Sequence, residues 1–324
     1  MLVVIDPTTG GALDVWTGSA TAAEVATILA HAVAPAASPA DASLRRGDAL
    51  LATGDSGAAV TAYDEALATG GLTWPGRPHA LEQLVSAAAA DPRTCVNRVA
   101  REAPALRREH PFVSLALTGV QCLRGDLALV GSPDGAQVEP LAREALDLPS
   151  ASEDERYMLF EALHAIRKQV GDVAGARAIA TRYYAYASTR PPGTSLDLRM
   201  ARDQAVLRAA VKLGTPDTVI ARLETSDREL ADAPAAERLA SAYSAAQRYP
   251  DAIAAATRGL ARNPGPSEQV RLFVQRAGNE VHTGDVTSAR HDLDEATQLI
   301  PRIGVPGERD VARSQIEAQR AALP

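Results

Sequence analysis

The sequence predicts a mainly α-helical protein. Alanine supplies about a fifth of the 324 residues and aromatic residues only 4%, and small side chains at that density suit helices packed closely together. From about residue 40 onward, segments with helical periodicity alternate with Gly, Pro and Asp, whereas the clearest strand pattern lies in the first 16 residues. We therefore expect a small N-terminal β element followed by a long helical array.

Charge and hydropathy exclude two classes of partner. Forty acidic residues against 33 basic ones give a net charge of −7, so no overall basic field is expected to attract nucleic acid. The longest apolar runs, such as Leu2 to Ile5, are far shorter than the roughly 20 residues that span a bilayer, so no membrane partner is expected. The first residues, MLVVIDPTTGG, lack the pattern of a secretory signal, which places the chain as given in the cytosol.

The chain has two cysteines, Cys95 and Cys122. They form no C-x-x-C motif, and no histidine stands beside either at metal-ligand spacing. We expect both to be buried free thiols, and we expect no metal and no other cofactor.

The N-terminal segment predicts a β-hairpin and a helix. The β-rich run Leu2 to Ile5 is followed by turn-forming residues up to Gly11, and Leu13 to Trp16 then alternates apolar and polar side chains. Ser19 can cap a helix with a wide apolar stripe. The expected domains are residues 1–34 (hairpin and helix), 35–39 (linker) and 40–324 (helical array).

A Gly-Asp dipeptide recurs as a predicted corner between two helices. Glycine supplies the left-handed residue that ends the first helix, and the aspartate side chain caps the second. Small or apolar residues follow Gly284 at offsets of five, nine and twelve, so the second helix has one continuous stripe. The corners are Gly54-Asp55, Gly125-Asp126, Gly171-Asp172 and Gly284-Asp285.

The spacing of these residues resembles the tetratricopeptide repeat family, whose unit is a helix-turn-helix of about 34 residues. The clearest copy runs from Ala236 to Pro264 and matches the family's small and large positions in register; further copies lie at 267–301 and 40–70. The resemblance implies a right-handed α-α superhelix with about seven helix pairs over 40–324. It also implies a protein-interaction scaffold.

The hairpin and its helix resemble the last third of a thioredoxin-like domain. That family's redox motif and cis-proline would precede Leu2, so no functional residue is carried over. The strand Leu2 to Ile5 is apolar on both faces, as an interior strand is. Either it packs on another element, or residues before Met1 are missing. In the second case the full protein could carry an export signal and lie outside the cytoplasm.

Two functional hypotheses follow. The first is a non-enzymatic scaffold that binds a protein or peptide partner in a concave groove. The second is the C-terminal, catalytically incomplete part of a thiol-disulfide oxidoreductase whose helical array positions substrates. Motifs of hydrolases, zinc proteases and nucleotide-binding enzymes are not found, so we expect the chain not to be an enzyme.

The candidate partner-binding residues come from the first helices of two successive repeats, which line the groove in proteins of this type. They would form a basic patch on an acidic protein, suited to an extended peptide with acidic residues. In the first repeat, Leu44 and Asp48 stand where some family members have the Lys and Asn that bind a C-terminal carboxylate, which disfavours that ligand. The candidate residues are Lys168, Gln204, Arg208 and Lys212.

Overall fold

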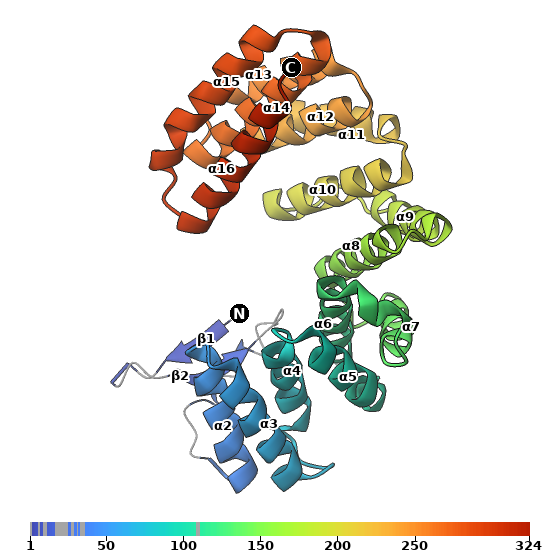
Figure 1. The fold of residues 1–324 in the computed structure, drawn as a ribbon, viewed down its shortest axis with the longest axis vertical. Helices are drawn as coiled ribbons and strands as arrows, with labels where there is room; N and C mark the ends of the chain where they lie inside the picture. The colour runs from blue at the N-terminus through green and yellow to red at the C-terminus, as the bar shows by residue number, and fades with distance from the viewer. Residues whose placement is uncertain are drawn as a thin grey trace. The chain divides into compact units, whose positions relative to one another are not determined.

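The computed structural model describes residues 2–5, 7–8, 12–16, 25–26, 29–30, 32, 36–107 and 111–324. The described chain is mainly α-helical, which confirms the expected fold class (Figure 1). It divides into two compact units, residues 1–179 and 180–324. The predicted boundaries at 34 and 39 remain a prediction.

The first unit begins with two strands and continues as a series of helices. Helix α2 packs on α3, α3 on α4, α4 on α5, α5 on α6, and α6 on both α7 and α8. Its elements are β1 (Leu2–Ile5), β2 (Ala12–Trp16), α2 (Pro39–Ala52), α3 (Ser56–Gly70), α4 (Arg77–Ala88), α5 (Pro92–Glu102), η1 (Ala103–Leu106), α6 (Pro111–Gly125), η2 (Leu127–Gly131), α7 (Gly135–Ala145) and α8 (Glu153–Gln169); α9 (Val173–Ser188) contains the boundary between the units.

The two strands form the expected antiparallel hairpin, with Leu2 opposite Trp16 and Val3 opposite Val15. Strand β2 lies against α2. The side chain of Ile5 is 57% exposed, so the end of β1 lacks the cover of an interior strand. The described residues of this hairpin give no support to a thioredoxin-like sheet, and the expected cap Ser19 lies outside them.

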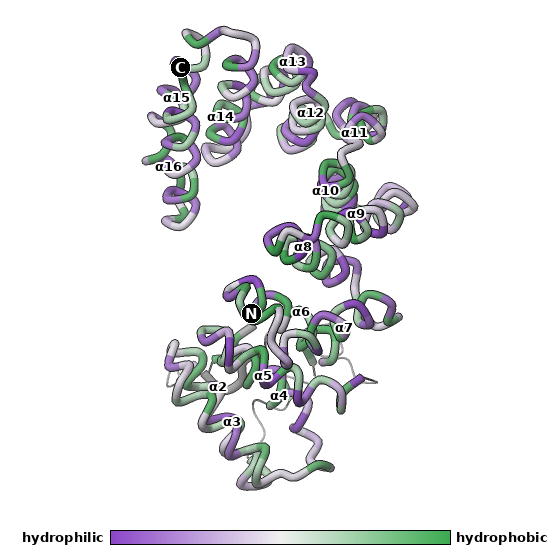
Figure 2. The backbone as a smooth tube through the Cα atoms, turned by 45° about the vertical axis from the view of Figure 1, so that its right-hand side comes forward, coloured by the Kyte–Doolittle hydropathy of each residue, from purple (hydrophilic) through white to green (hydrophobic). Residues whose placement is uncertain are grey.

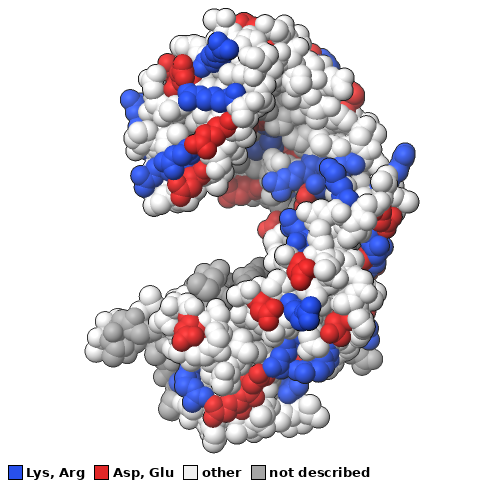
Figure 3. All heavy atoms as spheres, in the orientation of Figure 1, with Lys and Arg blue, Asp and Glu red and all other residues white. Residues whose placement is uncertain are grey.

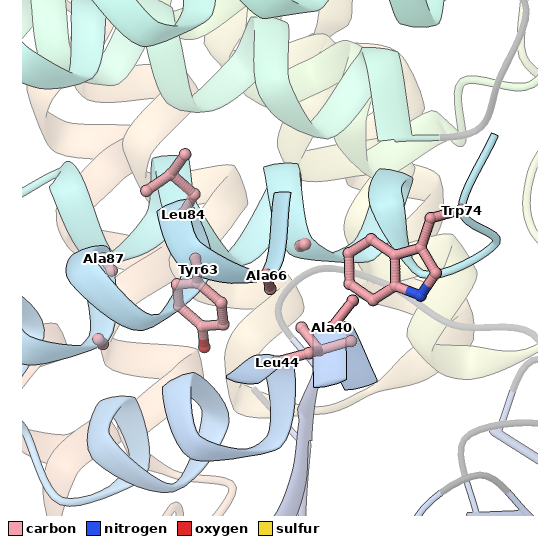
Figure 4. Packing of buried hydrophobic residues seen from close by; sticks show 9 residues of the cluster. Ala40, Leu44, Tyr63, Ala66, Trp74, Leu84 and Ala87 are labelled. Carbon is pink, nitrogen blue, oxygen red and sulfur yellow. The ribbon is translucent and has the colours of Figure 1, made fainter. Parts of the chain in front are cut away.

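The core of the first repeat forms around Tyr63 of α3, which is fully buried (Figure 4). Its hydroxyl donates a hydrogen bond to Asp48 Oδ1 of α2 at 2.8 Å. The indole of Trp74 lies beside Ala40 in Figure 4, and its Nε1 donates to Asp41 Oδ1 at 3.0 Å. Both polar groups of these large side chains are therefore satisfied where they meet α2.

Most of the predicted corners have the expected backbone. Gly54 and Gly284 both have φ of +85°, a conformation that glycine adopts without strain. The next residue caps the following helix in each case, and Asp285 accepts a hydrogen bond from the backbone NH of Ser288 at 3.0 Å. Gly125-Asp126 was expected to be a direct corner between two helices. Asp126 instead caps the 3₁₀ turn η2, which accommodates the extra residues before α7.

The prediction of free thiols was wrong. Cys95 of α5 and Cys122 of α6 form a disulfide, with their Cα atoms 6.3 Å apart. Both residues are buried, as expected. A spacing of 27 residues carries no signal of pairing by itself, because the contact arises only when α5 packs on α6.

The second unit repeats the helix-pair pattern. Helices α10, α12, α14 and α16 pack one on the next, and α11, α13 and α15 follow them as partners. Figure 2 shows apolar and polar segments alternating along the helices, as expected when each buries one stripe. Its helices are α10 (Leu196–Leu213), α11 (Asp217–Leu230), α12 (Ala233–Ala245), α13 (Tyr249–Leu260), α14 (Pro266–Thr283), α15 (Val286–Leu299), η3 (Ile300–Arg302) and α16 (Pro306–Ala321).

The expected stripe of the last repeat is buried as its spacing predicted. Ala289, Leu293 and Ala296 of α15 have no exposed surface and lie in one cluster with Val270 and Ala277 of α14. The register derived from the corner glycine is therefore confirmed in this repeat.

Candidate peptide-binding face

On α10 and α12, exposed or half-buried polar side chains stand at equivalent positions before the corner. Gln204 and Arg208 precede the corner residue Gly214 by ten and six positions, as Glu237 and Ser241 precede Gln247. Contacts extend this row to α14 and α16, and we call the whole set the first-helix face. It comprises Gln204, Arg208 and Lys212 of α10, Glu237 and Ser241 of α12, Arg271, Gln275 and Gly278 of α14, and Gln315 and Gln319 of α16.

Polar contacts join α12 to α14 across this face. Arg271 Nε donates a hydrogen bond to Glu237 Oε1 at 2.9 Å, and Gln275 Nε2 donates to Ser241 Oγ at 2.8 Å. These contacts fix long side chains that would otherwise be mobile, so the middle of the face is ordered before a partner arrives.

Two of the three basic residues of the face, Arg208 and Lys212, lie on α10, where Lys and Arg side chains gather in Figure 3. Gln204, Arg208 and Lys212 are four residues apart, so they occupy successive turns on one side of the helix. Arg208 is exposed, and Gln204 and Lys212 are half-buried. Lys168 is exposed on α8 of the first unit. Three of the four predicted residues thus lie on one helix, and a partner-binding role stays a prediction for all four.

A cluster of buried charge lies behind this face. Asp203 of α10 accepts hydrogen bonds from Arg222 Nε, at 2.8 Å, and from the Ser226 hydroxyl. Each carboxylate oxygen of Asp203 thus has a partner, which offsets the cost of burying its charge. The cluster fixes α10 against α11 and so positions the side of α10 that carries Arg208.

Arg238 of α12 borders the face and was not singled out by its spacing. It is 7% exposed, and its Nε and Nη2 have no hydrogen-bond partner among the described residues. Burial lowers the pKa of Arg238, while the carboxylates of Asp203, Asp232 and Glu237 act in the opposite direction. A buried guanidinium with unsatisfied donors therefore lies beside the first-helix face. Its burial arises only when α12 packs on α10.

A cleft of about 290 Å³ lies between α14 and α16. Arg271 belongs both to its lining and to the first-helix face, so the cleft borders that face. The cleft leaves no pattern in the sequence, because its walls come from two helices and the turn between α15 and α16. It is lined by Ser267, Val270, Arg271, Ile303, Gly307, Glu308, Val311, Ala312 and Gln315.

No group of three or more His, Cys, Asp or Glu side chains among the described residues is placed to hold a metal ion. The ring of His282 stacks on Tyr249 with centroids 4.3 Å apart, which gives it a packing role. Cys95 and Cys122 are joined and buried, whereas a reactive cysteine needs an accessible thiolate.

Every helix in the described part of the chain falls short of the length and hydropathy that a membrane span needs.

Solved structures resemble the chain, whereas family models and curated proteins do not. No protein-family model matches the chain, and no curated protein matches it. Among solved structures, the crystal structure of a tetratricopeptide repeat protein from Parabacteroides merdae ATCC 43184 is similar, with 12% sequence identity and a TM-score of 0.48. The match covers 87% of this chain and 98% of that one.

Proposed function

We propose that the chain is a non-catalytic scaffold that holds an extended protein or peptide segment on its first-helix face. The exposed guanidinium of Arg208, on the same side of α10 as Lys212, carries this proposal. On a protein with a net charge of −7, such a local basic strip favours a partner segment with acidic residues. Lys168, in the first unit, stays a proposed partner-binding residue in its own right.

The proposal predicts that charge reversal on α10 weakens partner capture. The test is a pull-down from lysate of the source cells, comparing the wild-type chain with the Arg208→Glu/Lys212→Glu variant. The matched control is Arg290→Glu/Arg302→Glu, which changes the net charge equally at exposed positions of the same unit.

A partner lost by the α10 variant, retained by the control and weakened by salt supports the proposal. Equal recovery of the same partner by all three chains contradicts it.

We also propose that the native protein matures in an oxidising compartment. The Cys95–Cys122 disulfide supports this, because structural disulfides form and persist outside the reducing cytosol. The expectation of a cytosolic location rests on the first residues of the chain as given. The disulfide instead favours a location outside the cytoplasm. The test is intact mass after thiol alkylation of protein isolated from its own source. An unlabelled chain supports the proposal, and two labelled cysteines contradict it.

A further inference from the structure

The cleft between α14 and α16 combines an apolar floor with the carboxylate of Glu308 in its lining. Its floor is formed by Val270, Ile303 and Ala312, which are all nearly fully buried. Val311 forms a wall and keeps 58% of its surface exposed. An apolar group that enters the cleft would cover this exposed surface, which is the source of favourable binding energy.

The lining of the cleft carries one residue of each charge, Arg271 and Glu308. Arg271 is already paired, because its Nε donates a hydrogen bond to Glu237 Oε1 at 2.9 Å. Glu308 is exposed and accepts a hydrogen bond from the Ser267 hydroxyl at 2.6 Å. With Arg271 paired, the carboxylate of Glu308 is the charge that the cleft offers to a ligand, and it attracts a positive group, in contrast to the basic residues of α10.

The volume sets the size of the occupant. About 290 Å³ lies at the lower end of ligand pockets, which suits one large apolar side chain rather than a cofactor. Because Arg271 also lies on the first-helix face, a segment bound along that face can place a side chain into the cleft.

We infer that the cleft is a specificity pocket for a partner segment in which a large apolar residue stands next to a basic residue. The apolar side chain fills the space over Val270 and Ala312, and the neighbouring Lys or Arg meets the carboxylate of Glu308. This inference rests on the proposed scaffold function and adds to it the chemistry of a second contact, at the α16 end of the face.

The test uses three synthetic peptides that share a Gly/Ser background and differ only at a central pair: Leu-Arg, Ala-Arg and Leu-Glu. Binding to the full chain is followed by NMR of the methyl groups of Val270, Ile303, Val311 and Ala312. We expect saturable shifts with the Leu-Arg peptide. We expect binding about tenfold weaker with Ala-Arg, which loses buried apolar surface, and about threefold to tenfold weaker with Leu-Glu, whose charge is reversed.

Two variants of the chain sharpen the test. Val311→Gln removes an apolar wall at an exposed position, and Val305→Gln is its control, because Val305 is similarly exposed (54%) and does not line the cleft. Glu308→Lys is expected to reverse the order of the Leu-Arg and Leu-Glu peptides. A purely structural role of Glu308, which accepts a hydrogen bond from Ser267, would not produce that exchange of specificity.

Each other outcome overturns the inference. Equal affinity for the three peptides would show that the cleft does not select the central pair. Equal binding by the Val311→Gln and Val305→Gln variants would show that the apolar side chain does not enter the cleft. Methyl shifts that depend on protein concentration without peptide would show that a second copy of the chain occupies the cleft. Failure of the proposed scaffold function would be seen in a different experiment. Its readout is the capture of a partner by the Arg208→Glu/Lys212→Glu variant, which does not involve the cleft.

Discussion

The ring of Tyr63 occupies the space that a side chain at position 47 would need. A β-carbon built on Gly47 would lie 2.4 Å from the ring carbon Cε1. The glycine of α2 and the tyrosine of α3 are therefore a matched pair, and the close approach of the two helices depends on both.

Gly47→Ala is expected to lower the free energy of unfolding by about 1–3 kcal/mol, because the added methyl group displaces a fully buried ring. Urea denaturation followed by circular dichroism measures the change. Gly57→Ala in α3 is the control: its β-carbon would meet nothing within 4 Å, and alanine favours the helix. Equal effects at both positions would contradict the packing described here.

Removal of the disulfide is expected to destabilise the first unit. For a loop of 27 residues, the loss of the cross-link in Cys95→Ala/Cys122→Ala corresponds to about 3–4 kcal/mol in the chain-entropy model. The urea transition that contains α5 and α6 should move to lower concentration, as hydrogen exchange of their amides can show. Unchanged exchange of these amides would show that the disulfide adds nothing to the packing.

Glu280 of α14 makes the stability of the second unit depend on pH. Burial raises the pKa of Glu280 to about 7; nearby Asp292 and Asp285 act in the same direction, against Arg276 and His291. In the unfolded chain a Glu side chain has a pKa of about 4.3. Between about pH 4 and pH 7 the folded state therefore binds a proton that the unfolded state has lost. The free energy of unfolding falls as the pH rises through this range.

The Glu280→Gln variant should therefore gain stability relative to the wild type, by about 1–3 kcal/mol, between pH 5 and pH 8. Urea midpoints at the two pH values measure this difference. Glu317→Gln, at an exposed position of α16, should follow the wild type at both values. A parallel pH dependence of Glu280→Gln and wild type would refute a raised pKa.

Ala289→Asp is expected to cost about 3 kcal/mol or more, because it places a carboxylate in a fully buried position between α14 and α15. Thr287→Asp is the control, since its exposed side chain lies in the first turn of α15, where negative charge is favourable. Thermal unfolding of both variants compares them directly. An unchanged melting temperature for Ala289→Asp would mean that this site can open to water.

The helix pairs could be predicted from the sequence because their signals are local. The left-handed corner at Gly284 and the buried stripe Ala289, Leu293 and Ala296 follow from spacing within one chain segment. The basic strip of α10 could be predicted for the same reason, since helical periodicity alone places Gln204, Arg208 and Lys212 on one side.

The features that escaped prediction depend on contacts between segments. The pairing of Cys95 with Cys122 requires the packing of α5 on α6. The unsatisfied guanidinium of Arg238 requires α12 to lie on α10, and the cleft requires the turn before α16. Such contacts leave no periodic pattern in the residues themselves.

The small number of buried residues in α16 has a consequence for local opening. Helix α16 buries only Ala312 and Ile316 among its described residues, whereas α12 buries eight of its own. In an array held by nearest-neighbour contacts, a helix that buries so few residues opens at a lower free energy than one that buries many, so α16 opens more readily than α12. Since Val311 and Gln315 belong to α16, each opening event dismantles the cleft. A ligand held there would slow amide exchange along α16 more than along α12.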